Sequence, residues 1–171
     1  MQSLANSTHL LFRRAEPAEY KVLTDISWRA KQIWPYPEEY FEIWREELTI
    51  SPAYVAANPV YVAVQENRIA GYYALVHNPY YRQIGEVRVE SGYWLEHIFV
   101  EPEVMYCGIG SGLLNHAVTI CRSIPCTRLL VFVDPFARGF YDKIGAQFLY
   151  DSPSSIPGRT IPVYQINIPI E

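Results

Sequence analysis

Short segments with extended character lie at three places in the first half of the chain. Residues 9–15 predict a first strand after a polar start. Residues 60–65 and 69–77 are rich in β-branched and aromatic side chains, and the polar residues 66–68 separate them. These two runs predict an antiparallel hairpin.

Helical spacing of apolar residues fills the interval between the first strand and the hairpin. Glu16-Pro17 is a helix-start signal, and apolar positions keep a 3.6-residue period from there to Pro35. A second helix is predicted over residues 37–48, because acidic residues follow Pro37 and a broad apolar face continues toward Ser51-Pro52.

The second half of the chain alternates strands with helices. After a tyrosine-rich connection, residues 86–100 have extended character interrupted at Ser91-Gly92, and residues 93–100 predict a central strand. A glycine-containing loop and an amphipathic helix over residues 108–122 follow. The nearly continuous apolar run at residues 128–133 is typical of a strand buried on both faces beside a parallel neighbour.

The chain closes with three further predicted elements. They are a short helix over residues 136–144 and strands over residues 147–150 and 161–168. With no internal repeat, the whole pattern predicts one mixed α+β domain over residues 1–171, in which residues 1–8 are expected to be loose.

Composition and charge exclude several classes of function. The chain has 14 Lys and Arg against 18 Asp and Glu, a formal net charge of −4, and its basic residues form no run or stripe. Nucleic-acid binding is therefore not expected. No run approaches the roughly eighteen apolar residues of a membrane span, and no targeting segment is evident, so we expect a cytoplasmic protein.

Cysteine usage gives no sign of a disulfide framework or a metal site. The three cysteines are an odd number, contain no CxxC pair and have no His at metal-ligand spacing. We expect no metal.

The loop before the helix at residues 108–122 has the composition of an anion site. It reads Met105-Tyr106-Cys107-Gly108-Ile109-Gly110-Ser111-Gly112. Glycines let the backbone approach a ligand, and the first N–H groups of a helix are unpaired donors, which favours a pyrophosphate. A tight turn without ligand is an alternative. A Rossmann loop would need a third glycine at Leu113, and a Walker loop would need a lysine.

Two motifs resemble the GNAT superfamily of N-acetyltransferases. The signature Arg/Gln-x-x-Gly-x-Gly/Ala after a strand and a Pro-containing turn corresponds to residues 95–102 followed by residues 105–110. The downstream Asn-x-x-Ala-x-x-Phe-Tyr pattern corresponds to residues 134–141, and the match extends over about residues 94–150. The resemblance implies an acyl-CoA N-acyltransferase fold with a mixed, mostly antiparallel sheet, splayed between its fourth and fifth strands (residues 93–100 and 128–133) and flanked by about four helices.

The same resemblance implies where coenzyme A binds. The pantetheine would run along the central strand, and the pyrophosphate would lie on the glycine loop. The residues expected to bind the cofactor are Ile98, Phe99, Val100, Met105, Tyr106, Cys107, Gly108, Ile109, Gly110, Ser111, Gly112, Asp134, Ala137 and Phe140.

Three positions depart from the family pattern. Met105 replaces Arg or Gln, Tyr106 stands where Gly is frequent, and Asp134 replaces Asn. An acidic residue beside a polyanionic cofactor is unfavourable. A CoA-binding sensor or regulatory module with little or no turnover is therefore the alternative function, and a dinucleotide-binding oxidoreductase is a more distant one.

The expected chemistry is direct attack of a primary amine on the thioester of acetyl-CoA. Glu96 occupies the place where many relatives carry a base, and burial beside Trp94 would raise its pKa. Strict strand alternation puts His97 on the opposite face, which argues against His97 as the base. Tyr141 matches the family tyrosine that protonates the leaving thiolate.

An acceptor pocket is expected to be aromatic. The residues expected to line it are Trp34, Tyr36, Tyr73 and Trp94, and Tyr40 and Tyr72 are further candidates. The acceptor would be a small-molecule amine or a peptide amine, and the protein would be a monomer or a homodimer.

Overall fold

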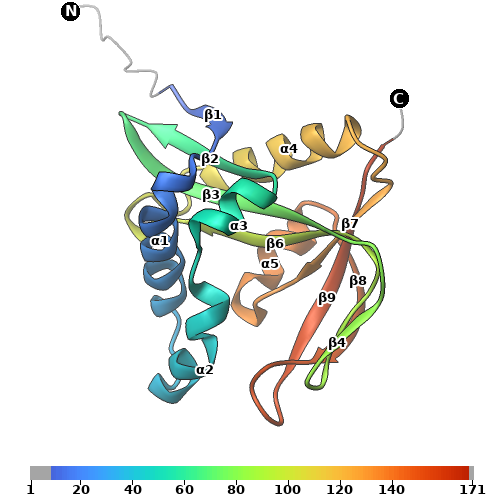
Figure 1. Ribbon diagram of the computed structural model, residues 1–171. Coiled ribbons are helices and arrows are strands. Elements are labelled where there is room, and N and C mark those ends of the chain that lie inside the picture. The colour runs from blue at the N-terminus through green and yellow to red at the C-terminus, as the bar shows by residue number, and fades with distance from the viewer. Residues whose placement is uncertain (1–8, 170–171) are drawn as a thin grey trace, which may run out of the picture.

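A seven-stranded sheet organises the computed structural model, which describes residues 9–169 (Figure 1). The spatial order of the strands is β1-β2-β3-β6-β7-β9-β8. Only β6 and β7 run parallel, whereas the other neighbours pair antiparallel. The predicted mixed, mostly antiparallel sheet is confirmed, and the expectation for residues 1–8 lies outside the described residues. The strands of this sheet are β1 (Leu11–Arg14), β2 (Val60–Gln65), β3 (Arg68–Asn78), β6 (Gly92–Val100), β7 (Arg128–Phe132), β8 (Gln147–Pro153) and β9 (Thr160–Asn167).

Five α-helices flank the sheet, one more than the expected number. They are α1 (Tyr20–Gln32), α2 (Glu38–Leu48), α3 (Pro52–Ala57), α4 (Ile109–Arg122) and α5 (Arg138–Lys143). Three 3-10 turns each begin at a proline, because the first helical turn does not need the missing N–H. They are η1 (Pro17–Glu19), η2 (Pro102–Val104) and η3 (Pro135–Ala137). Within residues 9–169, no helix combines the length and apolar character needed to cross a membrane.

Helix α3 was not predicted, because Ser51-Pro52 was interpreted as the end of the preceding helical pattern. The same two residues begin a new helix. Ser51 is the N-cap, and its Oγ accepts a hydrogen bond from the Tyr54 N–H at 3.1 Å, while Pro52 occupies the first helical position.

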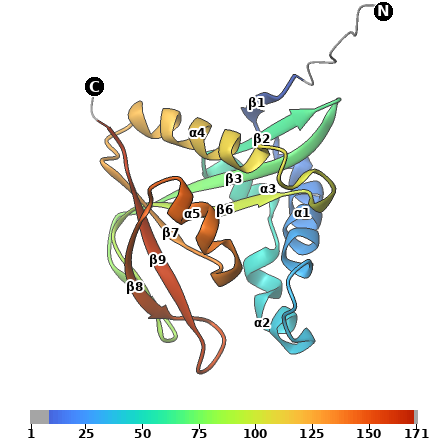
Figure 2. The same ribbon diagram turned by 180° about the vertical axis from the view of Figure 1, so that it is seen from behind.

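The two faces of the sheet carry separate hydrophobic cores. On one face, Leu23 and Ile26 of α1 and Val55 of α3 pack with buried residues of β2 and β3. On the other face, α4 and α5 pack over the sheet, where Leu113 is fully buried. Figures 1 and 2 show the two layers from opposite sides, with α1, α2 and α3 in front in the first view and α4 and α5 in front in the second.

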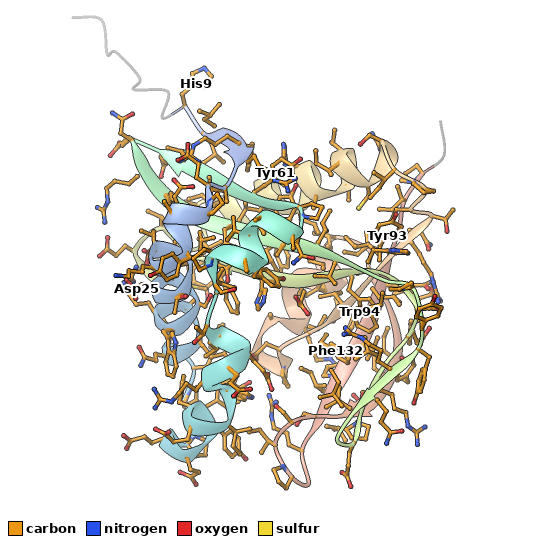
Figure 3. All side chains as sticks on the ribbon, viewed as in Figure 1. His9, Asp25, Tyr61, Tyr93, Trp94 and Phe132 are labelled. Atoms are coloured by element: carbon orange, nitrogen blue, oxygen red, sulfur yellow. The ribbon has the colours of Figure 1, made fainter. Side chains whose placement is uncertain are left out.

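A small hairpin covers the sheet where a single interrupted extended stretch was expected. Strands β4 (Arg82–Ile84) and β5 (Val87–Val89) pair with each other and form a separate two-stranded sheet. Below them, Trp94 is only 3% exposed and packs with Val89, Leu130 and Val163. The Trp94 ring stacks on Phe132 with 4.6 Å between ring centroids. Figure 3 labels both residues, which lie next to each other.

Candidate active site

The parallel strands β6 and β7 separate soon after they meet. Only Tyr93 and Trp94 pair with β7, opposite Leu129 and Leu130. Beyond Trp94, residues 95–100 keep β3 as a partner on one edge, and no described strand pairs with them on the other. The sheet is therefore splayed where expected, and the backbone of Ile98, Phe99 and Val100 borders the opening.

A β-bulge interrupts the alternation of β6 at Glu96. In the pairing with β3, Ala74 lies opposite His97 but Leu75 lies opposite Leu95, so Glu96 is the extra residue. The inserted residue shifts the phase of the side chains. Leu95 and Ile98 accordingly pack in the same core, whereas strict alternation had put them on opposite faces.

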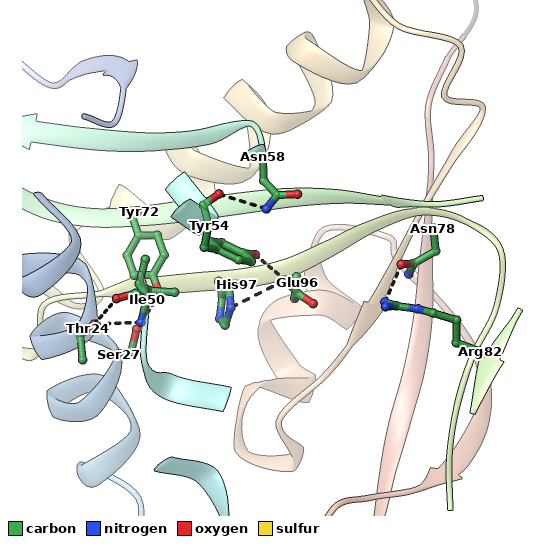
Figure 4. A network of polar contacts seen from close by, with 10 residues as sticks. All are labelled: Thr24, Ser27, Ile50, Tyr54, Asn58, Tyr72, Asn78, Arg82, Glu96 and His97. Carbon is green, nitrogen blue, oxygen red and sulfur yellow. Dashed lines mark hydrogen bonds and ion pairs between the residues drawn. The ribbon is translucent and has the colours of Figure 1, made fainter. Parts of the chain in front are cut away.

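The bulge brings Glu96 and His97 together, which corrects the expectation that they lie on opposite faces. His97 Nε2 and Glu96 Oε2 are 3.9 Å apart. Tyr54 of α3 donates a hydrogen bond from its hydroxyl to the same carboxylate oxygen, and the Tyr54 ring meets the His97 ring edge-on at 5.6 Å. Figure 4 shows this group, with Tyr54 and His97 both directed at Glu96.

Burial differs sharply within this group. The Glu96 side chain is 42% exposed, so the expected burial beside Trp94 is not found, whereas the His97 side chain is only 12% exposed. Burial lowers the pKa of His97, against the opposing effect of Glu96, so its imidazole is neutral near pH 7. Burial also raises the pKa of Tyr54, and the Glu96 charge adds to that increase. The site therefore holds an exposed carboxylate, a neutral imidazole and a protonated phenol.

The start of α4 offers a set of unpaired backbone donors. Gly108 is the N-cap with φ = 83°, and the first capping hydrogen bond runs from the Gly112 N–H to the Gly108 carbonyl at 2.9 Å. The N–H groups of Ile109, Gly110 and Ser111 precede it and have no backbone acceptor within residues 9–169. Such donors, with the helix dipole behind them, suit a diphosphate.

The residues before α4 form an open loop. Tyr106 is 91% exposed and has φ = 63°, in the left-handed region that favours glycine. Cys107 is exposed as well, and Met105 is half-buried. The loop is thus accessible to a ligand from outside.

Gly110 and Gly112 have different surroundings. A Cβ on Gly110 would lie 3.8 Å from Val100 Cγ2 and 3.8 Å from Phe140 Cε2, which is ordinary contact. A Cβ on Gly112 would lie 2.9 Å from Phe12 Cζ. Gly112 is therefore required for packing against β1, and its N–H is already paired. We do not retain Gly112 as a donor to the cofactor.

The motif at residues 134–141 lies next to the glycine loop at residues 105–110. Phe140 of α5 flanks Gly110, and its ring meets that of Tyr141 edge-on at 5.2 Å. Tyr141 is 4% exposed, and its hydroxyl has no hydrogen-bond partner among residues 9–169. Among the described residues, every side-chain nitrogen or oxygen that is fully buried has a hydrogen-bond partner. The Tyr141 hydroxyl has none, so it keeps some contact with solvent. Burial, together with the Asp134 charge, raises the pKa of Tyr141, which leaves the hydroxyl as a donor.

Asp134 is neutralised by the protein itself. Lys31 of α1 donates to Asp134 Oδ2 at 2.5 Å, and the Tyr36 hydroxyl donates to Oδ1 at 2.6 Å. Oδ1 also caps η3 by accepting from the Phe136 N–H at 3.0 Å. Burial would raise the pKa of Asp134, but Lys31 and these hydrogen bonds outweigh it and lower the pKa. The unfavourable effect of this carboxylate on a polyanion is thereby reduced.

The four residues expected in an acceptor pocket are divided by the structure. Trp34 and Tyr36 lie together against Phe136, with ring centroids 5.1 Å and 5.3 Å away. Tyr73 is fully buried on the α4 face, where its hydroxyl bonds His116 Nδ1 at 2.8 Å. Trp94 is buried below β5 and bonds the Glu90 carbonyl. The positions of Tyr73 and Trp94 do not agree with a role in contacting an acceptor.

Sequence reasoning missed three residues of this region. Tyr54 was hidden because α3 was not predicted. Lys31 and Arg159 meet the site only through tertiary contacts, and Arg159 Nη2 donates to the Tyr36 hydroxyl at 3.0 Å. Lys31 could have been suspected from the sequence, because it lies three residues before the aromatic Trp34, a spacing that places two side chains on one side of a helix.

Comparison with known proteins agrees with this geometry. A family model described as Acetyltransferase (GNAT) family matches residues 20–146. No curated protein sequence matches the chain significantly.

Solved structures share the fold at low sequence identity. The PaiA N-acetyltransferase of Thermoplasma acidophilum, solved in complex with coenzyme A, is 18% identical with a TM-score of 0.71, and the match covers 93% of this chain and 99% of that one. A GCN5-related N-acetyltransferase from Rhodopseudomonas palustris is 17% identical with a TM-score of 0.72, over 92% and 94% of the two chains. The ribosomal-protein-S18-alanine N-acetyltransferase of Escherichia coli is 16% identical with a TM-score of 0.64, over 95% and 96%.

Proposed function

Because the chain belongs to the acetyltransferase (GNAT) family, we propose that it transfers an acetyl group from acetyl-CoA to a primary amine by direct attack in a ternary complex. The observation that carries the proposal is the divergence of β6 from β7 after Trp94 and Leu130. It leaves a backbone edge open between the donors of α4 on one side and Glu96 and His97 on the other.

The coenzyme would be held mainly by backbone groups. The N–H groups of Ile109, Gly110 and Ser111 would receive the diphosphate, and the open edge of residues 98–100 would receive the amides of the pantetheine. Val100 and Phe140 flank Gly110 and would contact the pantetheine as it leaves the loop. With Met105 in place of Arg or Gln, these main-chain donors carry most of the binding.

Glu96 is the proposed base. Its exposed carboxylate can accept a proton from an incoming ammonium group directly or through a water molecule. Tyr54 holds the carboxylate from one side by its hydrogen bond. The distance of 3.9 Å to His97 makes the neutral imidazole a second candidate base, with Glu96 stabilising the imidazolium that would form.

Tyr141 is the proposed acid. When the amine nitrogen forms its bond to the carbonyl carbon and the carbon–sulfur bond breaks, the sulfur takes up a proton from the Tyr141 hydroxyl. The base has taken a proton from the amine, so exchange with solvent restores both groups. The raised pKa of Tyr141 keeps the hydroxyl protonated at neutral pH, so a proton is present when the thiolate forms.

Two measurements test the proposal. Calorimetry at physiological salt should detect binding of coenzyme A, and release of free thiol from acetyl-CoA should accelerate in the presence of primary amines. Absence of coenzyme A binding would overturn the assignment.

A CoA-binding module without turnover remains the alternative function. Met105 is the feature that favours it, whereas the pairing of Asp134 with Lys31 removes the other reason for it. Tight coenzyme A binding without turnover across a broad amine panel would favour this alternative.

A further inference from the structure

Arg159 carries a positive charge that the described residues do not pair with an acid. Its guanidinium lies against Tyr36 and Trp44, with Cζ 5.1 Å and 5.5 Å from the ring centroids. The Arg159 Nη2 group donates a hydrogen bond to the Tyr36 hydroxyl at 3.0 Å. The other N–H groups of the guanidinium have no acceptor among residues 9–169. The planar guanidinium is thus held in place while most of its hydrogen-bond donors are unused.

The loop between β8 and β9 fixes this position. Ile156 is 4% exposed and packs with Trp44 and Leu48 of α2. The Ser154 N–H donates to the Arg159 carbonyl at 2.9 Å, and the Arg159 N–H donates to the Ile156 carbonyl at 3.1 Å. Gly158 takes the left-handed conformation, with φ = 76°, that closes this turn. Arg159 is therefore positioned by the fold rather than by a flexible tail.

The charges around Arg159 leave a surplus of one positive charge. The cluster contains Lys31, Arg159 and Asp134, and Asp134 is already paired with Lys31 at 2.5 Å. The next acid that acts on Lys31 is Glu47, which is exposed on α2 and makes no ion pair with either cation. The Tyr36 hydroxyl gives its proton to Asp134 and accepts from Arg159, so it cannot supply a negative charge.

The cluster lies on the acceptor side and away from the expected diphosphate site. Helix α4 is at the top of both views, whereas α2 and the loop between β8 and β9 are at the bottom (Figures 1 and 2). The cluster is close to the proposed base, because Phe99 packs against the hydrophobic group of Trp44, Leu48 and Ile156, and the Phe99 ring centroid is 6.0 Å from that of His97.

We infer that Arg159 binds a carboxylate of the acceptor, so that the acceptor class is an amine that also carries a carboxylate. This inference rests on the proposed acetyl transfer. A carboxylate matches the two parallel donors of a guanidinium and the single surplus charge, whereas a phosphate dianion would call for a second free cation. Lys31 is not free, because it is bound to Asp134.

Matched acceptor series test the inference. Acetyl-CoA turnover is measured with ω-amino acids of increasing length and with the primary alkylamines of the same length, and rates are expressed per unprotonated amine. We expect kcat/KM for the best acid to exceed that for its matched amine by roughly 10- to 100-fold, the range for a hydrogen bond to a charged group. A further arm uses peptide amides whose only carboxylate is an acidic side chain, which separates a free amino acid from an acidic peptide as the source of the carboxylate.

Variants connect the preference to Arg159. Arg159→Met should reduce the ratio of acid to amine to about one, and Arg159→Lys should retain part of it because the charge remains but the fork is lost. Arg68→Met is the matched control, since Arg68 is exposed at the turn between β2 and β3, and the ratio should be kept. If Arg159→Met does not fold, calorimetry of the wild type with coenzyme A and N-acetylated acids against N-acetylated amines gives the same comparison.

The outcomes separate the two proposals. Equal kcat/KM for acids and amines in the wild type, or an unchanged ratio in Arg159→Met, would overturn the carboxylate inference and leave acetyl transfer standing. Binding of coenzyme A without turnover of any member of either series would contradict the proposed function, and the inference would fall with it.

Discussion

The Lys31 ammonium lies 2.5 Å from the Asp134 carboxylate and joins α1 to the end of β7, with both side chains largely buried at 13% and 16% exposure. A buried pair of this kind is costly to break on one side, because the remaining charge is left without a partner. The pair also holds Asp134 as the cap of η3. The pair therefore links α1 directly to the segment that follows β7.

Removal of either partner should destabilise the protein strongly. Lys31→Met and Asp134→Asn should each lower the free energy of unfolding by about 3 kcal/mol, and the double variant should lose clearly less than the sum. Urea unfolding of the four proteins gives the coupling energy. Arg45→Met is the control, because Arg45 of α2 pairs with Glu42 while both side chains are exposed, at 61% and 71%, and it should cost less than about 1 kcal/mol. Additive losses in the double variant would contradict the pairing.

Replacement of the proposed base should change the rate in a pH-dependent way. Glu96→Gln should lower kcat/KM by roughly 10²-fold, and the loss should be largest at low pH, where few amine molecules are unprotonated. The measurement is initial rate from pH 6 to 9 with a single amine. His97→Asn is measured beside it, since the two side chains lie 3.9 Å apart. A larger loss in His97→Asn than in Glu96→Gln would assign the proton transfer to the imidazole, and unchanged profiles in both would exclude both groups as the base.

His97 should also make the protein less stable toward acid. Burial lowers its pKa in the folded state below the ordinary value of about 6.5, so the unfolded chain binds more protons below that pH. The stabilisation is fully present above about pH 6.5 and is lost as the pH falls through the interval down to the lowered pKa. The unfolding free energy of the wild type should therefore fall by up to about 1.4 kcal/mol per pH unit more than that of His97→Asn over this interval. His116, whose pKa burial lowers too, is common to both proteins and cancels. Parallel pH dependences would contradict this prediction.

Substitutions at two glycines near the start of α4 should distinguish an effect on ligand binding from an effect on packing. Gly110→Ala has room for its methyl group and should keep or raise stability, by about 0.5 to 1 kcal/mol, while it weakens coenzyme A binding by roughly tenfold. Gly112→Ala should lose about 1 to 3 kcal/mol, because its Cβ would meet Phe12, and the folded fraction should bind coenzyme A normally. Thermal unfolding and calorimetry measure both quantities. The reverse pattern would mean that Gly112, and not Gly110, borders the cofactor.

Local patterns were sufficient to predict most of the elements of this fold. The periodicity over residues 108–122 predicted α4, and the apolar run after Arg128 predicted β7 and its parallel neighbour, because each pattern reports burial of that segment alone. The resemblance to the GNAT family implied an opening between β6 and β7, and the two strands separate beyond Trp94. The signal that failed was the one at Ser51-Pro52, where one dipeptide both ends a helix and begins another.

The arrangement of the site was less predictable, for a physical reason. A bulge adds one residue without changing composition, so the sequence around Glu96 contains no sign that it and His97 share a face. The contacts of Lys31 with Asp134 and of Arg159 with Tyr36 join segments more than a hundred residues apart in the chain. Such pairs depend on how the helices pack against the sheet, which a single sequence does not encode locally.

Tyr141 offers the most direct test of the chemistry, because its hydroxyl has no hydrogen-bond partner among the described residues and the buried ring is held by Phe140 and Tyr164. Tyr141→Phe removes only the hydroxyl, so packing and stability should change little. We expect kcat to fall by roughly 10²-fold with the Kd for coenzyme A within about twofold of the wild type. The control is Tyr164→Phe, which removes a nearby hydroxyl that donates to Asp142 at 2.9 Å. Equal losses of kcat in the two variants, or a loss of coenzyme A binding in Tyr141→Phe, would show that the Tyr141 hydroxyl acts through structure and not as the acid.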